Sequence, residues 1–188
     1  MHFRRVKKPL RMAQLQVLRV LRVSRAPGQR ARGLLRAGHR VVPVALGRSG
    51  IKANKREGDG ASPRGRFRLL RLWWRADRGP RPRSLLHIRR IRPDDGWCED
   101  PSDRRYNRPI KLPPRSPGDR LWREDGLYDL VIELDHNTRP RVAGRGSAVF
   151  IHVAREGFLP TAGCVALSVS DLRKLLGRLG SGTTIEIG

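Results

Sequence analysis

The sequence predicts a mainly β protein with one or a few helices, folded as a single domain. Short apolar segments rich in Leu and Val recur along the chain, separated by Gly and Pro residues, as is typical of strands joined by turns. Only one segment, near the C-terminus, repeats its apolar residues at helical spacing. The 188 residues are enough for one domain with a hydrophobic core.

The N-terminal third predicts three strands and a loop. Residues 15–23 are rich in Leu and Val, and residues 33–46 contain two short apolar runs on either side of a turn at residues 37–39. Pro43 indicates an edge strand, because proline has no amide hydrogen to donate to a neighbouring strand. Residues 47–65 contain five glycines and predict a long surface loop.

The middle of the chain combines strand signals with an irregular segment. Residues 67–74 and 127–134 predict strands, whereas the Pro-rich residues 78–126 are too long for a plain connection. We expect this irregular segment to pack over the sheet as a flap or pocket wall. Residues 147–153 predict a further strand, and residues 164–167 are short and apolar.

One helix is predicted near the C-terminus. Ser168 and Asp171 have the spacing of a capping box with Asp in place of Glu, and Gly180 provides a stop. These signals predict a helix over about residues 171–179 and a final strand at residues 183–187. Apolar residues recur at i, i+3, i+4 and i+7 in Leu172, Leu175, Leu176 and Leu179.

The chain is strongly basic, with a formal net charge of +24, and 35 of its 41 basic residues are Arg. Such a charge can bind nucleic acid or another polyanion. Acidic residues are interspersed, as at residues 94–95, 99–100 and 124–125, and no zinc-finger, basic-zipper or RNP pattern accompanies the arginines. We therefore favour a GC-rich codon composition, with most arginines on solvated faces, over a dedicated nucleic-acid-binding function.

The two cysteines, Cys98 and Cys164, allow at most one disulfide bond, so the hydrophobic core must hold the fold together. We expect Cys98 to be a buried free thiol rather than a partner of Cys164. The sequence contains neither a CxxC nor an HExxH pattern. We therefore expect no metal and no other cofactor.

The first residues do not form a convincing signal peptide. Residues 1–10 have a basic start, but three arginines interrupt the apolar stretch that follows. We divide the chain into a basic N-terminal segment, residues 1–14, and a folded domain, residues 15–188. We expect no membrane span, because the longest segment without a charged residue, 157–170, is too short to cross a bilayer.

One histidine and one cysteine are candidate catalytic residues. His152 lies on a predicted strand, and Cys164 follows Gly163 after a loop. An imidazole can take the proton of a nearby thiol and so produce a strong nucleophile. A glycine before the thiol would let a substrate carbonyl approach the amides of Gly163 and Cys164, which could donate to an oxyanion. The alternative is that both are buried packing residues, as free cysteines commonly are.

Three motifs occur in order along the chain. Residues 58–67, with the sequence GDGASPRGRF, come first, followed by residues 94–101, DDGWCEDP, with residues 106–107, YN. His152 with residues 161–164 and the helix that follows them forms the third. Together these motifs resemble the YkuD-type L,D-transpeptidases, a family of bacterial cell-wall enzymes, and the second motif resembles an element of the compact, stand-alone members.

The resemblance implies a β-rich L,D-transpeptidase catalytic fold and a transferase of peptidoglycan synthesis, cell-wall biogenesis or degradation, and cell shape. Cys164 would be the nucleophile that attacks a peptidoglycan stem peptide between its third and fourth residues. His152 would be the proton donor and acceptor, oriented by the backbone carbonyl of Val153. An amine of a second stem would resolve the thioester by L,D-transpeptidation, or water by L,D-carboxypeptidation. The expected partner is thus the stem peptide, and the expected location is the bacterial cell envelope or periplasm.

Two positions depart from the family's usual pattern. Ala162 stands where a second histidine is usual, and Ala166 where Asn or Arg is usual. These replacements remove polar groups that would contact the reacting thiol or the substrate, so the acyl acceptor and the substrate stay open. Two other functions also stay open: a catalytically weak member that binds the cell wall or another polyanion, and a basic nucleic-acid-binding protein.

Further residues are candidates for substrate binding. Thr161, Trp97 and Tyr106 could contact the peptide, although packing of the irregular segment would also explain the two aromatic residues. Residues 62–65 either lie beside the site or form the turn that starts the next strand.

Overall fold

The computed structural model describes residues 16–113 and 118–188. In this part of the chain the protein is mainly β with one α-helix, in a single compact domain, which confirms the predicted fold class. The predicted N-terminal segment, residues 1–14, lies outside the described residues. The large sheet consists of β1 (Val20–Arg25), β2 (Arg32–Ala37), β3 (Arg40–Ala45), β6 (Gly65–Trp74), β7 (His87–Arg90), β11 (Leu130–Leu134), β12 (Phe150–Val153), β13 (Val165–Leu167) and β14 (Thr184–Ile187).

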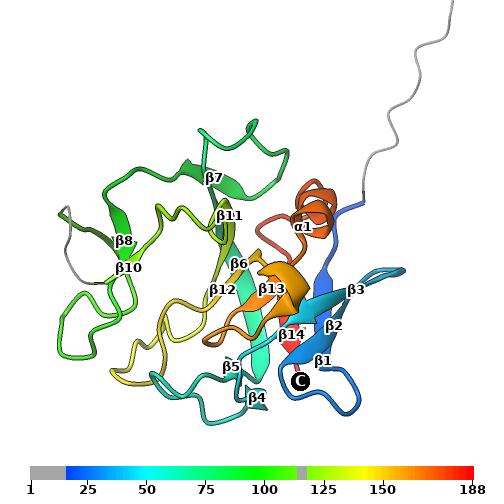
Figure 1. Cartoon of the computed structure of the whole chain (residues 1–188), viewed down its shortest axis with the longest axis horizontal. Coiled ribbons are helices and arrows are strands. Elements are labelled where there is room, and N and C mark those ends of the chain that lie inside the picture. The colour runs from blue at the N-terminus through cyan, green and yellow to red at the C-terminus, as the bar shows by residue number, and fades with distance from the viewer. Residues whose placement is uncertain (1–15, 114–117) are drawn as a thin grey trace, which may run out of the picture.

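The large sheet closes on itself (Figure 1). Its strand order is β11-β12-β13-β3-β2-β1-β14-β6-β7, and β6 also pairs with β11. Closure is possible because β6 is ten residues long, so that its first part pairs with β14 and its second part with β11. The side chains that point inward form the main hydrophobic core.

β2 and β3 form the predicted hairpin. Side chains of β2 alternate between exposed and buried, because successive residues of a strand point to opposite faces. Gly38, with a φ of 65°, supplies the left-handed conformation of the turn. Pro43 does not lie on an edge strand as predicted, because β13 adds to the outer side of β3. In β3 only Ala45 takes part in this pairing, so the pairing with β13 does not extend to Pro43.

The helix α1 (Val169–Leu176) begins and ends earlier than predicted. The hydroxyl of Ser168 accepts a hydrogen bond from the amide of Asp171 at 3.1 Å, so the predicted capping pair is present. An N-cap lies directly before the first helical residue, which places the start of the helix at Val169. Gly177 forms the C-cap instead of Gly180. The apolar face of α1 is buried in the main core through Leu172, Leu175 and Leu176.

The irregular segment packs against one side of the barrel, as predicted. It carries β7 and a small sheet of β8 (Asp95–Trp97), β9 (Pro109–Lys111) and β10 (Asp119–Arg120). A second hydrophobic cluster joins this sheet to the barrel, with Trp97 edge-on to Phe150 at 5.0 Å between ring centroids. Figure 1 shows β8 and β10 on the side of the barrel away from the β2–β3 hairpin.

Residues 47–65 are not only a surface loop. They contain two short parallel strands, β4 (Ile51–Lys52) and β5 (Ser62–Pro63). Ala61 and Ser62 are fully buried. The second half of this segment is therefore part of the folded domain, and it leads directly into β6.

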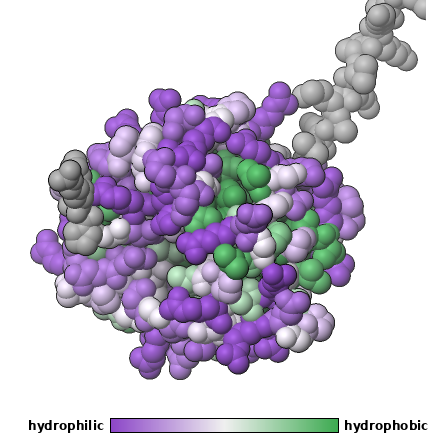
Figure 2. Space-filling view, in the orientation of Figure 1, coloured by the Kyte–Doolittle hydropathy of each residue, from purple (hydrophilic) through white to green (hydrophobic). Residues whose placement is uncertain are grey.

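The surface is dominated by polar groups. Figure 2 shows a face covered mainly by hydrophilic side chains, with hydrophobic side chains gathered in a few places. Some arginines form ion pairs on the barrel surface; Arg22 and Arg66, for example, both contact Glu186. None of the described helices is long and apolar enough to cross a membrane.

Candidate active site

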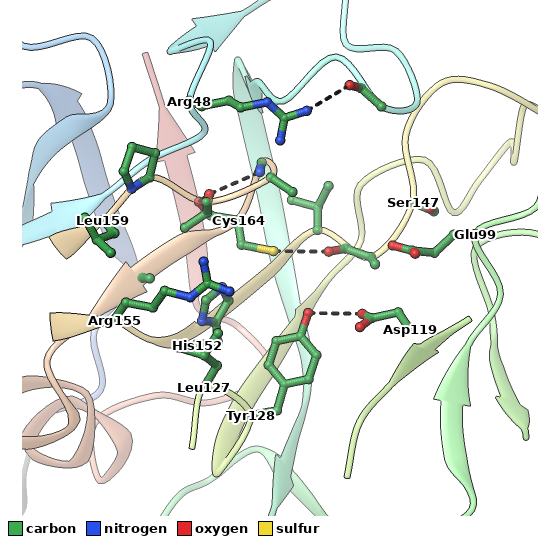
Figure 3. Close-up of a pocket in the computed structure, with 18 of the residues that line it drawn as sticks. Arg48, Glu99, Asp119, Leu127, Tyr128, Ser147, His152, Arg155, Leu159 and Cys164 are labelled. Carbon is green, nitrogen blue, oxygen red and sulfur yellow. Dashed lines mark hydrogen bonds between the residues drawn. The ribbon is translucent and has the colours of Figure 1, made fainter. Parts of the chain in front are cut away.

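The pocket that contains the predicted thiol and imidazole lies between the barrel and the irregular segment. It has a volume of about 670 Å³, and both Cys164 and His152 line it. His152 is on β12, which pairs in parallel with β13, and Cys164 directly precedes β13. The structure thus brings together two residues that are separated by a loop in the sequence (Figure 3).

The thiol of Cys164 is held by two backbone groups. Its Sγ donates to the carbonyl of Ala148 at 3.2 Å and accepts from the amide of Phe150 at 3.4 Å. Ala148 has a φ of 50°, a conformation that does not belong to a strand. For this reason β12 begins at Phe150 rather than at residue 147 as predicted, and the carbonyl of Ala148 faces the thiol.

The ring of His152 is held by its own neighbour in the chain. Its Nδ1 lies 2.8 Å from the carbonyl oxygen of Val153, the contact that the resemblance implied. Tyr128 packs edge-on against the imidazole, with ring centroids 5.4 Å apart. Nε2 has no hydrogen-bond partner among the described residues, and the side chain lines the pocket. The free nitrogen of the ring is therefore available to a bound molecule.

Burial keeps both groups neutral. It raises the pKa of Cys164 to about 12, although the amide of Phe150 acts in the opposite direction. Burial also lowers the pKa of His152 to about 4, against the effect of the Val153 carbonyl. Desolvation disfavours the charged form of each group. The resting pair at neutral pH is thus a thiol and a neutral imidazole rather than a thiolate–imidazolium ion pair.

The turn before Cys164 is fixed by Thr161. Its hydroxyl donates to the carbonyl of Cys164 at 2.7 Å and accepts from the amide of Gly163 at 3.1 Å. The Gly163 amide is therefore already hydrogen-bonded in this structure, and its role toward an oxyanion stays a prediction. The amide of Cys164 donates to no described residue, and it is the remaining backbone donor at this position.

Residues of the GDGASPRGRF motif, 58–67, also contact the turn before Cys164. Gly163 has a φ of 151°, and a Cβ there would lie 2.8 Å from the carbonyl oxygen of Ala61. The hydroxyl of Ser62 accepts from the amide of Gly47 at 3.0 Å and donates to the carbonyl of Cys164 at 3.4 Å. Ser62 thus lies beside the site, whereas the predicted turn is replaced by the short strand β5, after which β6 begins at Gly65.

A buried lysine joins this motif to the pocket. The ammonium of Lys55 donates to Asp59 at 2.7 Å and to the carbonyl of Arg56 at 2.6 Å. A Cβ on Gly163 would lie 3.5 Å from the Cε atom of Lys55. The ammonium lowers the pKa of Asp59 through its hydrogen bond and charge, although burial acts in the opposite direction. Asp59 of the Gly-Asp-Gly motif therefore anchors a positive charge in the pocket wall.

Trp97 and Tyr106, predicted to contact substrate, do not line the pocket. Both are buried in the interior. The indole of Trp97 donates to Asn107 at 3.0 Å, and the same Asn107 oxygen accepts from the amide of Ala148 at 3.2 Å. The hydroxyl of Tyr106 donates to Glu57 and accepts from the amide of Gly146. These residues hold the segment that carries the Ala148 carbonyl, because large aromatic side chains with a polar atom are stable when buried and hydrogen-bonded.

Several charged pocket residues were not predicted. Glu99 and Asp119 come from the irregular segment, and Arg48, Arg123 and Arg155 are also in the lining. Glu99 lies inside the DDGWCEDP motif, so its carboxylate was the signal that could have identified it. Asp119 and the arginines have no local pattern that separates them from the many other charges of the chain.

The two alanines of the unusual motif line the pocket as well. Ala162 and Ala166 are both in the lining, and each contributes only a methyl group. The polar groups of this pocket therefore come from other segments. Cys98 and Cys164 are both free and buried, in agreement with the prediction. No group of three or more potential metal ligands is found among residues 16–113 and 118–188.

A closed β-barrel with a buried thiol and an imidazole in one open pocket has the architecture of an enzyme domain. The family model of the L,D-transpeptidase catalytic domain (YkuD) matches residues 20–187, and the chain belongs to this family. It is therefore a transferase-type enzyme of the L,D-transpeptidase class, and peptidoglycan is its substrate. The comparison with curated proteins and the comparison with solved structures find no match.

Proposed function

We propose that this protein is a cysteine acyltransferase that acts on peptidoglycan stem peptides through a thioester on Cys164. The observation that carries the proposal is the shared pocket of Cys164 and His152, in which Nδ1 of the imidazole is engaged by the Val153 carbonyl and Nε2 is free. A general base needs an unprotonated nitrogen that can reach the nucleophile and the substrate.

The first half of the reaction transfers an acyl group to sulfur. Nε2 of His152 takes the proton from Cys164 while Sγ attacks the carbonyl carbon of the stem peptide. The amide of Cys164 donates to the developing oxyanion. The C–N bond then breaks, the leaving amine receives the proton from Nε2, and the acyl group remains on the enzyme as a thioester.

The second half releases the enzyme. An amine of another stem attacks the thioester to give a cross-link, or water attacks to give a shortened stem. In both cases Nε2 takes a proton from the nucleophile, the C–S bond breaks, and the sulfur regains a proton. The neutral thiol suits this cycle, because the proton moves only when the substrate is present.

A mass-spectrometric assay tests the proposal. The protein is incubated with purified disaccharide tetrapeptide, and intact protein and small products are measured together. We expect an acyl adduct on Cys164 and release of the terminal D-amino acid, and neither product with Cys164→Ala. Absence of both from the wild-type protein would overturn the proposal. Salt-sensitive murein binding without an adduct would instead support a polyanion-binding protein.

A further inference from the structure

One wall of the pocket is acidic. Figure 3 shows Glu99 and Asp119 entering from one side of Cys164, whereas Arg155 and Leu159 enter from the opposite side. Glu99 is open to the solvent of the pocket, and its carboxylate makes no hydrogen bond or ion pair with a described residue. Partial desolvation of the carboxyl group by the neighbouring protein raises its pKa to about 7, and the charges of Asp119 and Glu57 add to this effect.

The second carboxylate connects this wall to the imidazole. Asp119 accepts a hydrogen bond from the hydroxyl of Tyr128 at 3.0 Å, and Arg123 lies 3.7 Å from its other oxygen. The ring of Tyr128 in turn packs edge-on against His152. Tyr128 therefore lies between the acidic wall and the imidazole, which Figure 3 shows on the same side of the thiol as Arg155.

The two carboxylates oppose the formation of a thiolate. Their negative charges raise the pKa of Cys164 in addition to the larger effect of burial. An unpaired carboxylate in the pocket of a nucleophilic thiol disfavours the thiolate form in the resting enzyme. It becomes favourable when a cation binds beside it, because the cation neutralises the wall and stabilises the thiolate.

A second observation concerns another part of the same pocket. His152 is 6% exposed, and its Nε2 has no partner among the described residues, although the side chain lines the pocket. A nitrogen that exchanges a proton with Nε2 must lie in the pocket within reach of both the imidazole and the thiol. This requirement applies to the amine that leaves in the first half of the reaction and to the amine that attacks in the second.

We propose that Glu99 and Asp119 form the amine-binding side of the pocket and hold the acyl acceptor in its ammonium form. This inference rests on the proposed function and specifies its second substrate as a cationic amine. Glu99 carries the larger part of the role, because Tyr128 and Arg123 already engage Asp119.

The acceptor step moves two protons and exchanges a C–S bond for a C–N bond. The ammonium loses one proton to the Glu99 carboxylate, and the neutral nitrogen attacks the thioester carbon. A C–N bond forms while the C–S bond breaks. The second proton passes through Nε2 of His152 to the sulfur of Cys164, and Glu99 returns its proton to solvent.

The partition of the thioester between amine and water tests the proposal. The full-length protein is given disaccharide tetrapeptide as donor and 1,5-diaminopentane as acceptor, and the amide and hydrolysis products are quantified. We expect Glu99→Gln to lower the amide-to-hydrolysis ratio by about fivefold to tenfold, the effect of one nearby charge on a cation. Because both products come from the same thioester, their ratio does not depend on the rate of acylation, which is recorded separately as release of the terminal D-amino acid.

Two controls accompany this assay. Hydroxylamine, which is neutral at pH 7.5, should partition equally in wild type and Glu99→Gln. Glu156→Gln removes the same charge from an exposed residue that does not line the pocket, and it should behave as wild type. An unchanged diamine partition in Glu99→Gln, with normal acylation, would overturn the inference and leave the proposed function intact.

A second measurement does not depend on peptidoglycan. The rate of iodoacetamide alkylation of Cys164 is measured with 1,5-diaminopentane and with KCl at equal ionic strength. We expect the diamine to accelerate alkylation of the wild type in a saturable manner, because a bound ammonium lowers the pKa of the thiol. Glu99→Gln should react faster than wild type without the diamine and should not respond to it. Equal acceleration of both proteins would overturn the inference.

Discussion

The Nδ1 atom of His152 lies 2.8 Å from the carbonyl oxygen of Val153. A carbonyl only accepts hydrogen bonds, so Nδ1 carries the hydrogen of the neutral ring and Nε2 presents its lone pair. The backbone of the strand itself thus selects the tautomer, and no carboxylate is needed for this purpose.

The first prediction concerns His152→Gln. Glutamine has a similar polarity but cannot take a proton, so we expect thioester formation on Cys164 to slow by about 10²–10⁴-fold. The rate is followed by quenching the reaction and weighing the intact protein. Wild-type rates in this variant would show that another group removes the thiol proton.

The second prediction concerns the pH dependence of the thiol. With a pKa of about 12 for Cys164, the thiolate fraction rises tenfold per pH unit over the range below that value. We therefore expect iodoacetamide alkylation of Cys164 to increase steadily between pH 7 and pH 10, with peptide mapping to separate it from Cys98. A plateau near or below pH 7 would instead indicate a thiolate–imidazolium pair.

The third prediction concerns Gly163→Ala. The positive φ costs about 1–3 kcal/mol for a residue with a Cβ, and the new atom would lie 2.8 Å from the carbonyl oxygen of Ala61. We expect lower stability in urea unfolding and a strong loss of acylation, because the turn that carries Cys164 must move. Gly182→Ala is the matched control, since its Cβ would meet no atom within 4 Å. Equal behaviour of the two variants would contradict the prediction.

The fourth prediction concerns Asn107→Ala. The change leaves the indole of Trp97 and the amide of Ala148 without their acceptor, at a cost of about 1–3 kcal/mol for each buried group. We expect a lower unfolding midpoint and slower acylation, because the Ala148 carbonyl that holds the thiol is released. Asn54→Ala, an exposed position whose side chain contacts Arg145, should change neither. Full activity in Asn107→Ala would separate this network from the site.

The elements that were predicted correctly are those with a local cause. The hairpin of β2 and β3 follows from alternating apolar residues around Gly38, and α1 from a capping pair and four spaced leucines. The errors have causes outside the segment. Pro43 was predicted to lie on an edge strand because proline has no amide hydrogen, but β13, which comes from a distant part of the chain, pairs with β3 at Ala45. The start of β12 was misplaced because Ala148 adopts a positive φ where its carbonyl meets Cys164.

In the candidate site, too, residues with a local sequence signal were found and residues without one were not. His152 and Cys164 were found from the chemistry of their side chains and from a motif. For Trp97 and Tyr106 the sequence left substrate contact and packing open, and the structure buries both in hydrogen bonds that hold the pocket wall. Glu99 and Asp119 were missed, because a carboxylate acquires a role only from what surrounds it.

The sequence by itself therefore determined the mainly β class and the family, and it singled out His152 and Cys164 as candidate reactive residues, because periodicity, turn residues and motif order are local properties of the chain. Only the tertiary structure decided how these groups behave. Burial makes the Cys164–His152 pair neutral, Val153 selects the ring nitrogen, and the irregular segment brings Glu99 into the pocket of the thiol. The physical reason is that desolvation and charge act through space, between residues that the sequence keeps far apart.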